Sequence, residues 1–288
     1  MSVEVDWLRD RVDARSICEF IEQGVRRDAS RDVQLAVKVG RGGLDETTAL
    51  FTGGADIAVV APIAALCLLR QFGDLQGLFA LGVVPRRGCL VAAADAELPL
   101  RTVADLAGGT QCFTVATPAD DDVSLVGFAV HRALRLAGVS AGDVRFIYDD
   151  EPAACFERFA SGEADVVIHD PMSDPGWAGV AALRPVTYLP WGDRVVHGLA
   201  VQGWLPRTVP AGQLPGLDED VTALDCSDFA VLCRADLDDE LARLIARILT
   251  RGCRPAEVAA AVQTPLPLHP GAARAYADLV TDESLGSR

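Results

Sequence analysis

The sequence predicts an α/β protein with two similar lobes, and two observations lead to this prediction. Short apolar runs alternate with amphipathic stretches along the chain, which is typical of strand–helix–strand units around a largely parallel sheet. The same series of elements also occurs twice, near residues 33–61 and 112–169. Such doubling fits two lobes with a ligand cleft between them.

The first part of the chain shows helical periodicity at 14–27 and glycine pairs that end two short helices. Strands are predicted at 3–7, 33–39, 55–61, 78–83 and 89–94. Helices are predicted at 14–27, 44–51, 62–69 and 100–107, the third beginning at Pro62.

The second copy begins near residue 112. Strands are predicted at 112–116, 144–148 and 165–169, and helices at 123–137 and 152–160. Both copies contain a helix, a glycine, an Ala-Asp pair and an apolar run, as GGADI at 53–57 and GEADV at 162–166. In open α/β sheets, ligands bind beyond the carboxyl ends of the strands and near helix N-termini.

Composition and charge narrow the classes of function. Half of the 288 residues are hydrophobic and 23% are charged, which suits a packed core. No apolar run approaches the roughly 20 residues of a membrane-spanning helix, so no membrane insertion is expected. The net charge of −15 argues against nucleic acid and anionic membranes as partners.

The N-terminus predicts a cytoplasmic protein. Charged residues crowd the first 15 positions, whereas a secretory signal has a basic start and an apolar run of roughly 7–15 residues. The alternative is that a natural signal preceded this sequence and was replaced at Met1.

The sequence predicts neither a metal site nor a cofactor. The eight cysteines form no CxxC pair, and the four histidines add no metal-ligand spacing. In a cytosolic chain such cysteines are usually small buried hydrophobes.

Several segments resemble the TAXI subfamily of solute receptors, which serve TRAP-type transporters. The segment VPAGQLPGLDEDV at 209–221 is similar to a turn of the form IPAGxYPGxDEDV in that family. RADL at 234–237, PLHPGA at 267–272 and LRPV at 183–186 also agree with the family pattern, and the resemblance extends from about Val33 to the C-terminus.

The resemblance implies the type 2 periplasmic-binding-protein fold, with two α/β lobes, two crossovers and a central ligand cleft. Lobe one would comprise residues 1–110 and 222–288, and lobe two residues 111–221. The family usually has a Gly/Ser/Thr-rich loop after its first strand. Here residues 7–16 read WLRDRVDARS, and arginines could replace the loop amides because a guanidinium suits carboxylate geometry.

Candidate site residues lie where strands end or helices begin. Residues 40–45 (GRGGLD) suit close approach of backbone amides to an anion. Thr117 and Ser124 flank the equivalent turn of the second copy. The predicted ligand-binding residues are Trp7, Arg41, Gly42, Gly43, Pro62, Arg86, Thr117, Ser124 and His169.

Each candidate also has a structural interpretation. His169 and Asp170 close a strand and are the best general acid and base in the chain, or else the histidine bonds across a hinge while Asp170 caps a turn. Arg86 either reaches an anion or lies at a solvated hairpin tip. The aspartates at 120–122 cap a helix or face a cationic ligand.

Three functions remain open from the sequence. The first is a non-catalytic receptor that closes on a small organic ligand, carboxylate- or amino-acid-like. The second is a cytoplasmic biosynthetic enzyme on the same fold, of the lyase, decarboxylase or dehydratase type, using His169 and Asp170. The third is a ligand sensor that acts on a protein partner, which no sequence feature identifies. Nucleophile-elbow, P-loop, HExxH and dinucleotide fingerprints are lacking from the sequence.

Overall fold

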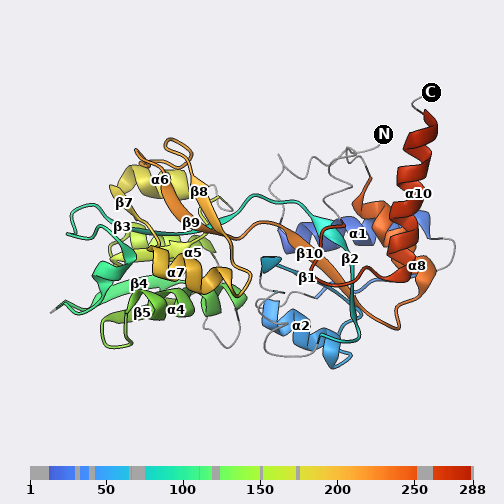
Figure 1. Ribbon diagram of the computed structural model, residues 1–288, viewed down its shortest axis with the longest axis horizontal. Coiled ribbons are helices and arrows are strands. Elements are labelled where there is room, and N and C mark those ends of the chain that lie inside the picture. Colours follow the sequence, from blue (N-terminus) through green and yellow to red (C-terminus); the bar gives the residue numbers. More distant parts are fainter. Residues whose placement is uncertain are drawn as a thin grey trace. The chain divides into compact units, whose positions relative to one another are not determined.

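The chain divides into two compact units. Unit 1 comprises Met1–Arg86 and Asp228–Arg288, and unit 2 comprises Arg87–Ser227. Both contain helices and strands (Figure 1), so the predicted α/β class is confirmed. The computed structural model describes residues 13–29, 33–38, 43–64, 66, 75–109, 111–118, 124–149, 152–172, 176–251 and 262–286. The strand predicted at 3–7 lies outside these ranges.

Unit 1 contains a three-stranded antiparallel sheet with the order β1-β10-β2. The strands are β1 (Ile57–Val60), β10 (Phe229–Arg234) and β2 (Leu78–Val84). Val60 pairs with Ala230, and Val84 pairs with Phe229. The central strand therefore comes from the C-terminal part of the chain, which is why that part belongs to unit 1.

Helices α1, α8 and α10 share one apolar core with this sheet. The helices of unit 1 are α1 (Ala14–Asp28), α2 (Gly43–Phe51), α8 (Asp239–Leu249) and α10 (Pro270–Gly286). Asp13 and Ser16 form a capping box that begins α1, and Ile17, Ile21 and Val25 are its buried face. Among the described helices, none is long and apolar enough to cross a membrane.

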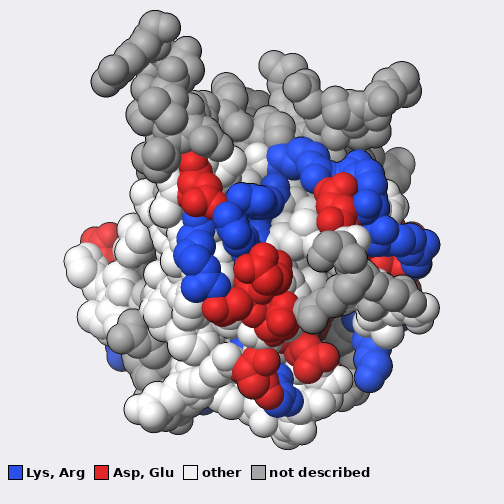
Figure 2. All heavy atoms as spheres, turned by 90° about the vertical axis from the view of Figure 1, so that its right-hand side faces the viewer, with Lys and Arg blue, Asp and Glu red and all other residues white. Residues whose placement is uncertain are grey.

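Ion pairs join the outer surfaces of these helices. Arg243 and Arg247 of α8 share Asp278 of α10 at 2.6 and 3.0 Å, and Arg251 pairs with Asp28 at the end of α1. Figure 2 shows a face on which Lys and Arg side chains form a band beside Asp and Glu. The side chains of these pairs are partly exposed, so water screens their attraction and each pair contributes little to stability.

Unit 2 contains a sheet with the order β5-β4-β6-β3-β9-β8, and β7 also pairs with β3. The strands are β3 (Cys89–Asp95), β4 (Phe113–Thr117), β5 (Val144–Tyr148), β6 (Val166–His169), β7 (Val186–Leu189), β8 (Pro206–Val209) and β9 (Val221–Asp225). Strands β4 and β6 are buried throughout, which is typical of strands covered on both faces.

Helices of unit 2 surround this sheet. They are η1 (Val103–Leu106), α4 (Leu125–Ala137), α5 (Pro152–Ala160), α6 (Gly176–Leu183) and α7 (Asp193–Ala200). Phe156 and Trp177 of α5 and α6 pack in one core with Val91 and Ala116 of the sheet. Helix α4 packs against α7, and Gly198 of α7 leaves room for the Leu136 side chain.

The doubled sequence motif corresponds to a doubled structure. In each copy a helix ends at a glycine with positive φ, Gly53 at 73° and Gly162 at 80°, and a buried strand follows. Ala55 and Ala164 then donate backbone hydrogen bonds back to the preceding helix. Both glycines thus end a helix in a conformation that L-residues rarely adopt.

Several expectations differ from the structure. Residues 87–110 and 222–227 lie in unit 2 rather than in lobe one, because β3 and β9 belong to the unit 2 sheet. Residues 84–87 are not a hairpin tip, since β2 and β3 are in different units and do not pair.

Two expectations about strands are also wrong. The described residues 33–38 form no strand, although Val33 and Leu35 pack against the core. The described sheets are not largely parallel. Only β4 runs parallel to its neighbours β5 and β6, because β3 enters in the opposite direction.

Arg184, which follows α6, joins separate segments of unit 2. Its Nε and Nη2 donate to Asp95 Oδ2 at 2.9 and 2.7 Å, and its Nη1 donates to the carbonyls of Ala164 and Phe159. The Asp95 and Arg184 side chains are only 18% and 16% exposed. Burial opposes the charged form of Asp95, but the Glu97 amide and Arg184 outweigh it and lower the Asp95 pKa.

Replacing Gly24→Ala should destabilise unit 1. A Cβ at Gly24 would lie 2.8–2.9 Å from three atoms of Ile248, so α1 and α8 would have to separate. We expect a loss of about 1–3 kcal/mol in urea unfolding. Gly179→Ala is the control, because a Cβ there meets no atom within 4 Å and the change should be neutral or stabilising.

Replacing Asp95→Asn should destabilise unit 2 in a pH-dependent way. A lowered folded pKa contributes stability above the unfolded value of about 3.9, and this contribution disappears as pH falls through the folded pKa. The difference in unfolding free energy between wild type and variant should therefore be largest near pH 7 and shrink below about pH 3.9. A difference that is the same at pH 7 and pH 3 would contradict this account.

Candidate functional site

One edge of the unit 2 sheet collects the polar residues that the sequence singled out. Thr117 ends β4 opposite Tyr148, which ends β5, and His169 ends the neighbouring strand β6. Because β3 is antiparallel to β6 and β9, the start of β3 at Cys89 and the end of β9 at Asp225 lie along the same edge. The chain also leaves unit 2 there, so we call it the crossover edge of unit 2.

Thr117 is the most unusual residue on this edge. Its side chain is completely buried, and its Oγ1 has no hydrogen-bond partner among the described residues. Aligned residues of parallel strands point to the same face, so Thr117 and Tyr148 share one face of the sheet. Tyr148 bonds to His131 of α4, which places Thr117 on the α4 side.

A buried hydroxyl without a partner costs about 1–3 kcal/mol, so structures rarely contain one. The Thr117 carbonyl accepts from the Asp149 amide at 3.3 Å. Among the described residues, the Thr117 side-chain hydroxyl finds no partner, although it can both donate and accept a hydrogen bond.

Ser124 is the N-cap of α4. Its Oγ accepts from the Gly127 amide at 3.2 Å, so this side chain holds the helix start that lies after β4 in the chain. The first-turn amides of a helix have no intrahelical acceptors and favour an anionic group. The aspartates at 120–122 lie outside the described residues.

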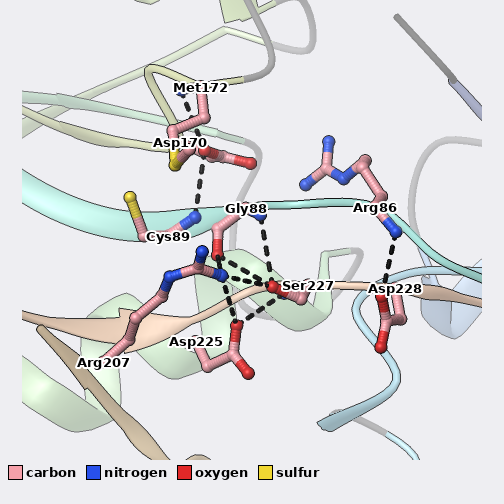
Figure 3. A network of polar contacts seen from close by, with 9 residues as sticks. All are labelled: Arg86, Gly88, Cys89, Asp170, Met172, Arg207, Asp225, Ser227 and Asp228. Atoms are coloured by element: carbon pink, nitrogen blue, oxygen red, sulfur yellow. Dashed lines mark hydrogen bonds and ion pairs between the residues drawn. The ribbon is translucent and has the colours of Figure 1, made fainter. Parts of the chain in front are cut away.

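His169 and Asp170 are both buried and both make structural hydrogen bonds. His169 Nδ1 accepts from the Asp170 amide at 2.6 Å, which puts the proton of a neutral ring on Nε2. Asp170 Oδ1 accepts from the amides of Cys89 and Met172, each at 3.1 Å (Figure 3). Asp170 thus caps a turn and fixes the start of β3, the structural interpretation that the sequence left open.

Two predicted residues lie along the corresponding edge of unit 1. Pro62 follows the end of β1 and is buried, and the adjacent Ile63 amide donates to Asp228 at 3.2 Å. The Arg86 amide donates to Asp228 Oδ1 at 2.9 Å, and its guanidinium lies 5.1 Å from the Phe229 ring centroid. Arg86 is therefore held at a crossover.

Of the remaining predicted binding residues, apart from Thr117, Ser124 and His169, the structure describes Gly43 alone. Gly43 is the first residue of α2, and Trp7, Arg41 and Gly42 lie outside the described residues. A cavity of about 640 Å³ in unit 1 is lined by α1, residues 34–38, α2 and residues 54–59. Among the described residues that line it, none is a predicted site residue.

Sequence reasoning missed two polar groups on the crossover edge of unit 2. The Tyr148 hydroxyl and His131 Nε2 are 3.0 Å apart, beside stacked Phe146. Arg207 of β8 donates to Gly88 O, Asp225 Oδ1 and Ser227 Oγ at 3.3, 3.4 and 2.7 Å (Figure 3). The Asp-x-Ser spacing at 225–227 signals a side-chain-capped turn, but nothing local points to Arg207.

Replacing Asp170→Ala should destabilise unit 2 even in the absence of any ligand. The change leaves the buried amides of Cys89 and Met172 without their acceptor, and we expect a loss of about 2–4 kcal/mol in urea unfolding. Asp170→Asn retains an Oδ1 acceptor and should keep most of the stability. Equal stability of the alanine variant and wild type would show that these bonds are not structural.

Comparisons with known proteins give only distant structural matches. No protein-family model matches the chain, and no curated protein matches its sequence. A solved periplasmic transporter is similar at 10% identity and a TM-score of 0.49, covering 96% of this chain and 91% of its own. A Xanthomonas citri protein bound to chloride is similar at 11% identity and a TM-score of 0.49, covering 96% of this chain and 91% of its own. The ligand-binding component of an ABC-type import system from Staphylococcus aureus is similar at 12% identity and a TM-score of 0.47. The match covers 94% of this chain and 89% of that protein. With such identities and TM-scores below 0.5, none of these matches assigns a ligand or an activity to this chain.

Proposed function

We propose that this protein is a non-catalytic receptor that binds a small organic molecule at the crossover edge of unit 2. The observation that carries the proposal is the fully buried Thr117 hydroxyl without a hydrogen-bond partner among the described residues. A ligand that bonds to this hydroxyl would remove the cost of leaving it unsatisfied, so binding would be coupled directly to that group.

The chemistry of this edge favours a ligand with a carboxylate or another anionic group. Thr117 can donate to an anion, and the first turn of α4 adds backbone amides and the positive end of a helix dipole. Strand ends beside helix N-termini are where open α/β sheets bind ligands. Carboxylate-bearing metabolites such as amino acids are therefore the ligand class to test first.

A receptor is favoured over an enzyme because the best acid–base pair is engaged in structural bonds. Asp170 accepts two backbone amides, and His169 Nδ1 accepts a third. Neither arrangement needs a substrate. In the lyase-type alternative, protons would have to pass through His169 Nε2 or Asp170 Oδ2, because Nδ1 and Oδ1 hold these backbone amides.

We also propose that the receptor is of the TAXI type. The turn at 209–221 supports this proposal, because Gly212 and Gly216 have φ values of 76° and 75° and the Gly212 amide donates to Leu217 O at 2.8 Å. The segment at 267–272 also supports it, since its backbone pairs with Ala80 of β2.

The experiment is a ligand screen on wild type and Thr117→Val. Thermal shifts with a panel of small carboxylic acids and amino acids identify a ligand, and calorimetry then compares affinities. Valine replaces the hydroxyl with a methyl group of similar size, so the ligand-free variant should be more stable by about 1–3 kcal/mol, while ligand affinity falls about tenfold. Thr187→Val is the matched control. Thr187 pairs with Ala94 near the end of β3, away from the crossover edge at the start of that strand.

Mass spectrometry of the recovered ligand separates receptor from enzyme. A receptor returns its ligand chemically unchanged. Conversion of the ligand that is abolished by His169→Ala would establish the enzyme alternative. A ligand affinity that Thr117→Val leaves unchanged would show that the ligand does not bind at the proposed site.

A further inference from the structure

The chain passes between the two units at two places, the Arg86–Arg87 and Ser227–Asp228 peptide bonds. On each side of these bonds, residues of the same unit hold the two crossing segments together. The hydrogen bonds that do so define which backbone torsions are left to absorb a movement between the units.

On the unit 1 side, Arg86 and Asp228 form a reciprocal pair. The Asp228 amide donates to Arg86 O at 3.1 Å, and the Arg86 amide donates to Asp228 Oδ1 at 2.9 Å (Figure 3). Asp228 has φ of 65°, a left-handed conformation that aspartate tolerates better than most residues. The Ile63 amide donates to its carbonyl and holds it there.

On the unit 2 side, Ser227 and Arg207 hold Gly88. Gly88 O accepts from the Cys226 amide at 3.2 Å and from Arg207 Nη1 at 3.3 Å. The Gly88 amide donates to Ser227 Oγ at 3.2 Å, and the same oxygen accepts from Arg207 Nη1 at 2.7 Å. One guanidinium therefore bonds to both crossing segments (Figure 3).

We propose that Ser227 and Arg207 are positioning residues that form a latch, restricting movement between the units to the backbone torsions next to the two crossing peptide bonds. With the latch closed, Gly88 and Ser227 move with unit 2, and Arg86 and Asp228 move with unit 1. Only Arg87 lies between them on the first crossing segment.

Opening the latch lengthens the free segments. Without the Ser227 hydroxyl, the Gly88 amide loses its acceptor and Arg207 loses its shortest bond. Each backbone residue that is freed gains conformational entropy. The units would then sample a wider range of arrangements. The latch acts with or without a bound ligand, so this inference does not depend on the proposed function.

The test measures the distance between the units in the ligand-free full chain. Spin labels are introduced as unnatural amino acids at the exposed residues Glu240 in unit 1 and Glu157 in unit 2, so that the native thiols stay in place. Double electron–electron resonance gives the distance distribution for wild type, Ser227→Ala and Arg207→Met. Both variants should widen the distribution. Ser161→Ala, whose hydroxyl bonds to Arg158 O on the surface of unit 2, should not.

Hydrogen exchange shows whether the latch has been opened. The Gly88 amide should exchange about two- to thirteenfold faster in Ser227→Ala, since a hydrogen bond of this kind contributes about 0.5–1.5 kcal/mol. Faster exchange with a wider distribution supports the latch. Faster exchange with an unchanged distribution overturns it, and so does unchanged exchange. Arg207→Met gives an independent result if the serine variant does not fold.

Discussion

Much of this structure depends on the position of β10 between β1 and β2. Strand β10 comes after unit 2 in the chain, yet it supplies the middle of the unit 1 sheet, and its residues Val231 and Cys233 are completely buried in the core. Without it β1 would have no strand partner among the described residues, and β2 would keep only its bridge between Ala80 and Leu268. The chain must therefore cross between the units twice, and both crossings begin and end at strands of the two sheets.

This constraint also explains where polar chemistry collects. The strands that lead to the crossings end or begin at the same edge of each sheet, so Arg86 and Asp228 meet in unit 1, and Gly88 and Ser227 meet in unit 2. In unit 2 the same edge contains Thr117. A buried hydroxyl that lowers stability is consistent with a residue retained for binding rather than for folding.

Local patterns predicted much of the fold but not its assembly. Strand β5 and helix α5 have the predicted bounds, because their apolar periodicity and flanking turn residues are local signals. The predictions of a strand at 33–39 and of a hairpin at 84–87 are wrong for the described residues. Both depend on which strands pair with one another, and local patterns do not determine that pairing. Because ligands bind at strand ends in open α/β sheets, the sequence alone singles out Thr117 and His169 as candidate binding residues. It could not find Arg207, whose contacts with Gly88 span 119 positions in the sequence.

We propose that the Thr117 hydroxyl is a ligand-binding group. A crystal structure of the protein with the small molecule that it retains from a metabolite extract tests this proposal. It should show an unmodified ligand whose polar atom lies within hydrogen-bond distance of Thr117 Oγ1. A ligand bound elsewhere, with that hydroxyl still lacking a partner, would contradict it.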